Sequence, residues 1–132
     1  MKVVLDTNIF ISGIHWPGPS GKVLISWFDD LFELVSSEEI VEEITRVLMN
    51  FKVPLSTTTI NLWKNIILEK SIIVKPTEII SIVKEDPGDN KIIEAAVAGN
   101  ANYIISNDKH LLKLKEFRNI KIIKPEDFLK VL

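Results

Sequence analysis

Acidic residues follow two apolar segments that have the composition of buried strands. Asp6 ends the run from Lys2 to Leu5, and Asp108 comes two residues after the strand-like segment 103–106. In an open α/β fold, the carboxyl ends of the strands form the edge at which ligands bind. A carboxylate at that edge can bind a metal ion, whereas an isolated one often only caps the helix that follows. The function of these two acids therefore depends on which other acids reach the same edge.

Glu43 is placed near this edge by helical periodicity. Ser36 and Glu39 form a capping box that predicts a helix over 37–50. In such a helix, Glu43 falls at the border of the apolar face, whereas Glu42 points into solvent. Taken alone, Glu43 is more simply explained as a surface acid that flanks the core.

Two more acids lie at the start of a helix expected over 89–99. Asp86 and Pro87 have the order of an N-cap and a first helical residue, which explains Asp86 without any ligand. Asp89 points in the same direction as the apolar residues of this helix. Because an unpaired carboxylate in the protein interior is unstable, capping leaves the inward direction of Asp89 unexplained.

If the sheet is parallel, four acids reach one region, and a fifth lies beside them: Asp6, Glu43, Asp89 and Asp108, with Asp86 as the fifth. Two carboxylates about 4 Å apart repel by roughly 4 kcal/mol at an effective dielectric constant near 20. Such a cluster requires protonation or a bound cation. Oxygen ligands without cysteine favour Mg²⁺ or Mn²⁺. This chemistry suits phosphodiester hydrolysis, in which the metal polarises the phosphate, activates water and stabilises the leaving oxygen.

The elements that must position these acids alternate between apolar strands and amphipathic helices, which is typical of a parallel α/β sheet. We expect strands over 2–6, 32–36, 72–74, 103–106 and 120–123. We expect helices over 7–14, 20–30, 37–50, 57–70, 89–99 and 108–114, a helical turn over 78–82, and a last helix that begins at Pro125.

Length and composition limit the class of protein. The 132 residues are enough for one compact domain, expected over 1–132, and too few for two. We expect no membrane-spanning helix, because no run of about 18 apolar residues occurs. The chain has no cysteine, which fits a reducing cytoplasm and excludes thiolate metal ligands. The net charge of −2 is unusual for a protein that binds duplex nucleic acid mainly through its phosphates.

The chain resembles the PIN-domain family, and within it the VapC-like toxin ribonucleases. The resemblance covers essentially the whole chain in the expected order, through the segments 4–8 (VLDTN), 37–44 (SEEIVEEI), 86–96 (DPGDNKIIEAA) and 103–112 (YIISNDKHLL). It implies a Rossmann-like, three-layer α/β/α fold with a five-stranded parallel sheet. It also implies a Mg²⁺- or Mn²⁺-dependent endoribonuclease with an RNA substrate, and an antitoxin protein as a partner.

The resemblance assigns roles residue by residue. Asp6, Glu43, Asp89 and Asp108 match the catalytic, metal-binding acids of the family, and Asp86 matches an accessory metal-site acid. Asn8 and Ser106 match polar residues that hydrogen-bond these carboxylates or the substrate. The family often has threonine where this chain has Ser106, and both residues carry a hydroxyl.

The helix expected over 57–70 carries more apolar residues than one core-facing stripe needs. They are Ile60, Leu62, Trp63, Ile66, Ile67 and Leu68. The excess favours a second buried contact, so we expect self-association into a homodimer or the binding of a partner peptide.

Two other functions compete with the nuclease. The first is a non-catalytic module of the same fold that binds RNA or a partner protein. The second is a receiver-like or phosphatase-like α/β domain, which also carries an aspartate at the end of its first strand. Receiver domains place a lysine after a late strand, whereas Lys109 directly follows Asp108, so this alternative ranks low. Assays of nuclease activity separate the first alternative from the enzyme.

Overall fold

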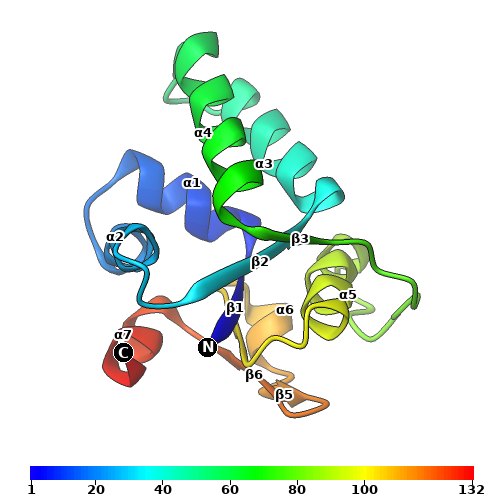
Figure 1. The fold of residues 1–132 in the computed structure, drawn as a ribbon. Coiled ribbons are helices and arrows are strands. Elements are labelled where there is room, and N and C mark those ends of the chain that lie inside the picture. Colours follow the sequence, from blue (N-terminus) through cyan, green and yellow to red (C-terminus); the bar gives the residue numbers. More distant parts are fainter.

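The computed structural model describes all 132 residues, and its centre is a six-stranded sheet with the order β3-β2-β1-β4-β6-β5 (Figure 1). The strands are β1 (Lys2–Leu5), β2 (Glu33–Ser37), β3 (Ile72–Val74), β4 (Tyr103–Ile105), β5 (Glu116–Phe117) and β6 (Ile120–Ile123). Strands β3, β2, β1, β4 and β6 run parallel, and β5 runs antiparallel to β6. The predicted α/β class with five parallel strands is confirmed, and one short antiparallel strand is added to it.

Helices cover both faces of this sheet. They are α1 (Thr7–His15), α2 (Pro19–Phe28), α3 (Glu38–Asn50), α4 (Thr57–Lys70), α5 (Asn90–Ala98), α6 (Lys109–Leu112) and α7 (Pro125–Val131), and a 3-10 turn, η1 (Pro87–Asp89), precedes α5. Helix α5 packs against β1, β2 and β4, whereas α1, α2 and α7 lie together on the other side (Figure 1). The result is the predicted three-layer arrangement. No helix has both the length and the apolar character needed to cross a membrane.

The core is one cluster of 31 buried apolar residues. The middle strand β1 is covered on both faces, and its residues Val3, Val4 and Leu5 are almost fully buried. This explains why the strand reads as a continuous apolar run rather than an alternating one. Leu5 pairs with Ile105 of β4, so the residues that follow these two strands leave the sheet side by side.

Helix α3 begins one residue later than the sequence predicts. The N-cap is Ser37, whose Oγ accepts a hydrogen bond from the backbone N–H of Ile40 at 3.3 Å. The predicted capping box between Ser36 and Glu39 is therefore wrong. Strand β2 continues through Ser36. The Ser36 hydroxyl is buried and has no hydrogen-bond partner.

The predicted helical turn over 78–82 is also wrong, because this segment has no regular secondary structure. Side chains of α5 hold the segment instead. Glu94 accepts a hydrogen bond from the backbone N–H of Ile80 at 2.9 Å, and Asn90 accepts one from that of Val83 at 2.8 Å. Ile80 and Val83 are themselves buried in the core. Tertiary contacts thus fix the approach to the turn that carries Asp86 and Asp89.

The added strand β5 forms a hairpin with β6 through Arg118 and Asn119. Both residues have positive φ angles, of 48° and 68°, as the central residues of a type I′ turn require. The sequence lacks the Asn-Gly or Asp-Gly pair that usually marks such a turn, so its signal was weak. Arg118 also pairs with Glu78 of the irregular segment, which ties the hairpin to the rest of the molecule.

Candidate functional site

Asp6 lies directly after β1 and is only 4% exposed. It occupies the N-cap position of α1, yet its side chain caps no backbone N–H. Instead its Oδ2 accepts a hydrogen bond from the Ser106 hydroxyl at 2.7 Å. Burial is the largest cause that raises the pKa of Asp6 to about 6, and the nearby charges of Asp108 and Glu43 contribute to the rise, which the hydrogen bond from Ser106 reduces. Capping therefore does not explain this buried acid.

Ser106 connects the acids that follow β1 and β4. Its Oγ donates to Asp6 and accepts a hydrogen bond from the backbone N–H of Asp108 at 2.9 Å. Asp108 also caps α6, because its Oδ1 accepts a hydrogen bond from the backbone N–H of His110 at 2.7 Å. The expected capping function of Asp108 is thus present, and its other carboxylate oxygen takes no part in that cap.

Three acids approach one another closely enough to share a metal ion. Oxygen atoms of Asp86, Asp89 and Asp108 all lie within 4.8 Å of each other. Asp86 sits at the N-cap position of η1, but its side chain makes no capping hydrogen bond. The sequence-based explanation of Asp86 as a simple cap is therefore wrong. The turn directs both of its acids toward the end of β4.

Asp89 is the acid that is least satisfied. Its Oδ2 is buried and has no hydrogen-bond partner. Desolvation is the largest cause that raises the pKa of Asp89 to about 8. The charges of Asp6, Asp108 and Asp86, and a hydrogen bond that the protonated form makes with the Asp108 side chain, contribute to the same rise. A buried carboxylate oxygen without a partner is rare in folded proteins and requires an explanation. A cation bound between these acids would satisfy this oxygen and offset the repulsion.

Glu43 projects from α3 and already has a partner for each carboxylate oxygen. Its Oε1 lies 2.9 Å from Lys91 Nζ, and its Oε2 accepts a hydrogen bond from the Thr7 hydroxyl. Its charge contributes to the raised pKa of Asp6, so Glu43 lies at the border of the cluster. The structure therefore brings four of the predicted acids into mutual electrostatic contact and places Glu43 beside them in a separate ion pair.

Thr7 and Lys91 contact Glu43, and the sequence did not predict either contact. Asn8 lies exposed in the first turn of α1 and has no hydrogen bond to the acids, so a contact of Asn8 with the substrate stays a prediction. Lys91 lies in the first turn of α5, where the helix dipole disfavours a cation. That unfavourable position is the signal in the sequence that could have pointed to a carboxylate partner.

The donor set fits a hard divalent cation. All of the candidate ligand atoms are carboxylate oxygens, which Mg²⁺ and Mn²⁺ prefer over nitrogen and sulfur. The unpartnered oxygen of Asp89 is an independent observation that favours a cation ligand at this position. Protonation of Asp89 relieves the same repulsion when no cation is bound.

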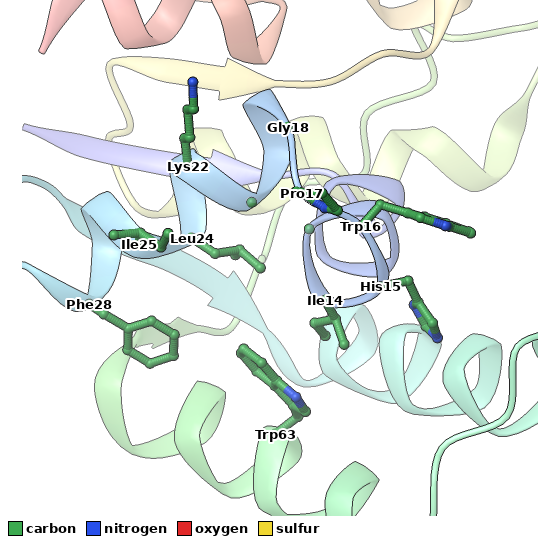
Figure 2. Close-up of a pocket in the computed structure, with 12 residues that line it drawn as sticks. Ile14, His15, Trp16, Pro17, Gly18, Lys22, Leu24, Ile25, Phe28 and Trp63 are labelled. Carbon is green, nitrogen blue, oxygen red and sulfur yellow. The ribbon is translucent and has the colours of Figure 1, made fainter.

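A separate cavity of about 490 Å³ lies between α1, α2 and α4. It is mostly apolar, and Figure 2 shows Ile14, Phe28 and Trp63 turned toward one another, whereas Lys22 points away. Trp16 is 45% exposed at its border. None of the five acids lines this cavity, so it is a second surface feature, distinct from the acidic cluster.

Helix α4 leaves part of its apolar surface uncovered. Ile60 and Ile67 are buried, and Trp63 and Ile66 pack partly against the core. Leu62 is 58% exposed. The excess of apolar residues noted in the sequence is therefore present at the surface, and self-association through this helix stays a prediction.

Comparisons with known proteins agree with this architecture. A family model described as a PIN domain matches residues 2–110 of the chain. MJ1680, an uncharacterised protein of Methanocaldococcus jannaschii, is 29% identical over an alignment of 141 positions, and the alignment covers 98% of this chain and 90% of that protein.

Solved structures share the fold at lower identity. A chain from the crystal structure of VapBC2 from Rickettsia felis, bound to a DNA fragment from their promoter, has a TM-score of 0.64 and 17% identity, with 94% of this chain and 98% of that chain covered. A chain from FitAcB of Neisseria gonorrhoeae has a TM-score of 0.56 and 13% identity, with 94% and 98% covered. At these identities the likeness shows the arrangement of helices and strands alone.

Proposed function

The chain belongs to the PIN-domain family, and from this premise we propose that it is a Mg²⁺- or Mn²⁺-dependent endoribonuclease that serves as the toxin of a type II toxin–antitoxin pair. Members of the family are generally nucleases. Proteins named in the similar structures are VapBC2 and FitAcB. These relationships support the class of reaction, and the residues of the acidic cluster support how it proceeds.

The observation that carries the proposal is the buried, unpartnered Oδ2 of Asp89 among other acids. Asp86, Asp89 and Asp108 would hold the cation, and Asp6 and Glu43 would border it. A bound cation would polarise the scissile phosphate and activate the attacking water. Without it, the raised pKa of Asp89 favours a protonated carboxyl, so binding of the cation is expected to release this proton.

The surrounding residues of the chain hold the acids in position. Ser106 fixes the carboxylate of Asp6 relative to the backbone of Asp108. The cap at His110 limits the rotation of the Asp108 side chain. Such outer hydrogen bonds orient ligands and tune their basicity, so they make the site specific for one arrangement of the acids.

The experiment that tests the proposal is the cleavage of RNA by purified protein with Mn²⁺ and with a chelator. The Asp6→Asn variant is expected to lose cleavage with its fold intact, which circular dichroism checks. Asp127→Asn removes one exposed acid from α7 and serves as the matched control, with cleavage unchanged. Full activity of Asp6→Asn would remove Asp6 from the site. RNA binding without cleavage by the wild-type protein would favour the non-catalytic module.

We also propose that the protein binds an antitoxin protein and forms a homodimer through the exposed residues of α4. We further propose that residues 1–132 form a single domain and that the protein acts in the cytoplasm. The absence of cysteine supports a reducing compartment, and the single core cluster supports one domain. Sedimentation that shows a monomer at high protein concentration would contradict the dimer.

A further inference from the structure

Lys91 occupies a position that local rules disfavour. It lies in the first turn of α5, where the partial positive charge of the helix terminus repels a cation. Its side chain is also only 12% exposed, although lysine side chains are rarely buried without a partner. A sequence that breaks a local rule in this way usually does so at a functional site.

The partners of Lys91 belong to the acidic cluster and to its supporting turn. Its ammonium group lies 2.9 Å from Glu43 Oε1 and donates a hydrogen bond to the backbone carbonyl of Gly88 at 2.8 Å. Gly88 separates Asp86 from Asp89 in the turn η1. Lys91 thus connects the acid on α3 to the turn that carries two of the candidate ligands.

This ion pair differs from the other three in the molecule. Lys70–Asp30, Lys113–Glu85 and Arg118–Glu78 each include at least one side chain that is half exposed or more. In the pair of Lys91 and Glu43, the two side chains are 12% and 24% exposed. Lys91 is therefore the one cation that forms an ion pair with any of the five acids.

We propose that Lys91 is a positioning residue that serves as a built-in counter-cation of the acidic site. In the metal-free protein it neutralises Glu43 and holds the turn η1 close to α3. Because its charge opposes a second cation nearby, it also weakens the affinity of the site for a divalent metal. This inference rests on the proposed function, since it concerns the same metal site.

A purely structural ion pair and a counter-cation predict opposite effects on metal binding. If Lys91 only supports the ligands, a neutral side chain at position 91 disorders the turn and weakens the binding of Mn²⁺. If Lys91 competes with the metal, the neutral side chain removes a repulsion and strengthens the binding. Both functions predict a lower melting temperature of the metal-free protein, so the direction of the change in affinity decides between them.

The test is the titration of Mn²⁺ by calorimetry, with melting curves recorded without metal and at saturating Mn²⁺. Lys91→Met is expected to bind Mn²⁺ about tenfold more tightly than the wild type, by the Coulomb energy of one removed charge after screening. Without metal, the melting temperature of Lys91→Met is expected to lie below that of the wild type. The increase in melting temperature at saturating Mn²⁺ is expected to be larger for the variant. Lys91→Arg keeps the charge and is expected to bind with wild-type affinity.

Lys70→Met is the matched control, because it removes one positive charge and leaves one acid, Asp30, unpaired at a distant site. Its Mn²⁺ affinity is expected to equal that of the wild type. Unchanged or weaker binding by Lys91→Met would overturn the proposal. If Lys91→Met does not fold, Lys91→Gln replaces it. If neither folds even with saturating Mn²⁺, the residue is structural and the proposal is wrong. Failure of the wild type to bind Mn²⁺ would instead refute the proposed function.

Discussion

The same type of side chain behaves in opposite ways in two regions of this molecule. At the carboxyl edge of the sheet, burial and neighbouring acids raise the pKa of Asp6 and Asp89. On the surface near the β5–β6 hairpin, hydrogen bonds from Arg118 and Lys113 lower the pKa of Glu78 and Glu85. Each of the surface acids is paired with a flexible cation in water, whereas the edge contains Asp89, whose buried Oδ2 has no partner in the protein. The difference indicates where a ligand is needed.

The largest effect is expected when Asp89, the acid with the unpartnered oxygen, is replaced. Asp89→Asn is expected to abolish binding of Mn²⁺, and with it a stabilisation of about 2.7 kcal/mol at a hundredfold excess of metal over its dissociation constant. Without metal, the same variant is expected to be more stable than the wild type near neutral pH, because Asp89 must take up a proton when the chain folds, whereas a neutral amide needs none. Melting curves with and without Mn²⁺ measure both effects, and Asp127→Asn is the control. A wild-type response to Mn²⁺ would exclude Asp89 from the site.

The two regions also predict opposite dependences of stability on pH. Because the folded protein holds a proton on Asp6 and Asp89 more tightly than the unfolded chain does, the free energy of unfolding falls as pH rises from about 4 through about 6 and about 8. For Asp6, a rise in pKa to about 6 corresponds to at most about 3 kcal/mol. The lowered pKa of Glu78 and of Glu85 has the opposite effect. The free energy of unfolding that their ion pairs contribute is lost as pH falls in the acid range, because protonation removes the charges.

Denaturant unfolding between pH 5 and pH 8.5 measures this dependence with a chelator present. Saturating Mn²⁺ is expected to abolish the decline, because the metal binds the ionised acids. A metal-free stability that rises steadily over this range would contradict the raised pKa of the edge acids. Asp6→Asn should reduce the decline below about pH 6 and move the later part to lower pH, because the charge of Asp6 contributes to the raised pKa of Asp89.

A smaller effect is expected when the hydrogen bonds of Ser106 to Asp6 and to the backbone of Asp108 are removed. Ser106→Ala removes the hydroxyl that donates to Asp6 and accepts from the backbone of Asp108, while the buried volume changes little. Loss of such an outer contact typically costs about 10-fold to 100-fold in metal affinity. Calorimetry with Mn²⁺ checks this, and Ser106→Thr, which keeps the hydroxyl, is expected to retain most of the affinity. Equal affinity for the alanine variant would show that the acids need no such bridge.

The smallest effect is expected on the surface. Glu78→Gln removes the ion pair with Arg118, in which both side chains are about half exposed. Water and salt screen an exposed pair of this kind, so the melting temperature and the Mn²⁺ affinity should hardly change. A large loss of stability would mean that this pair, which joins the irregular segment to the β5–β6 hairpin, holds more of the fold than its exposure suggests.

Local sequence rules succeeded where one element decides the outcome. The apolar run of β1 and the amphipathic pattern of α3 predict a buried strand and a helix, because burial of one periodic face is a local property. The same rules failed at Ser36 and at residues 78–82. At Ser36, the strand β2 continues through the residue expected to cap the helix. At residues 78–82, hydrogen bonds from side chains of α5 hold the segment. Neighbouring residues in the sequence give no sign of either interaction.

At the candidate site, the order of strands and helices read from the sequence already places the acids at strand ends and helix starts, and hence at one edge of the sheet. Their partners emerge only in the folded chain: Ser106 connects Asp6 to the backbone of Asp108, Lys91 and Thr7 bind Glu43, and the buried Oδ2 of Asp89 has no partner. Charge interactions and desolvation depend on distances in space, here between residues up to a hundred positions apart. Periodicity sets the direction of a side chain, and only packing sets its partners.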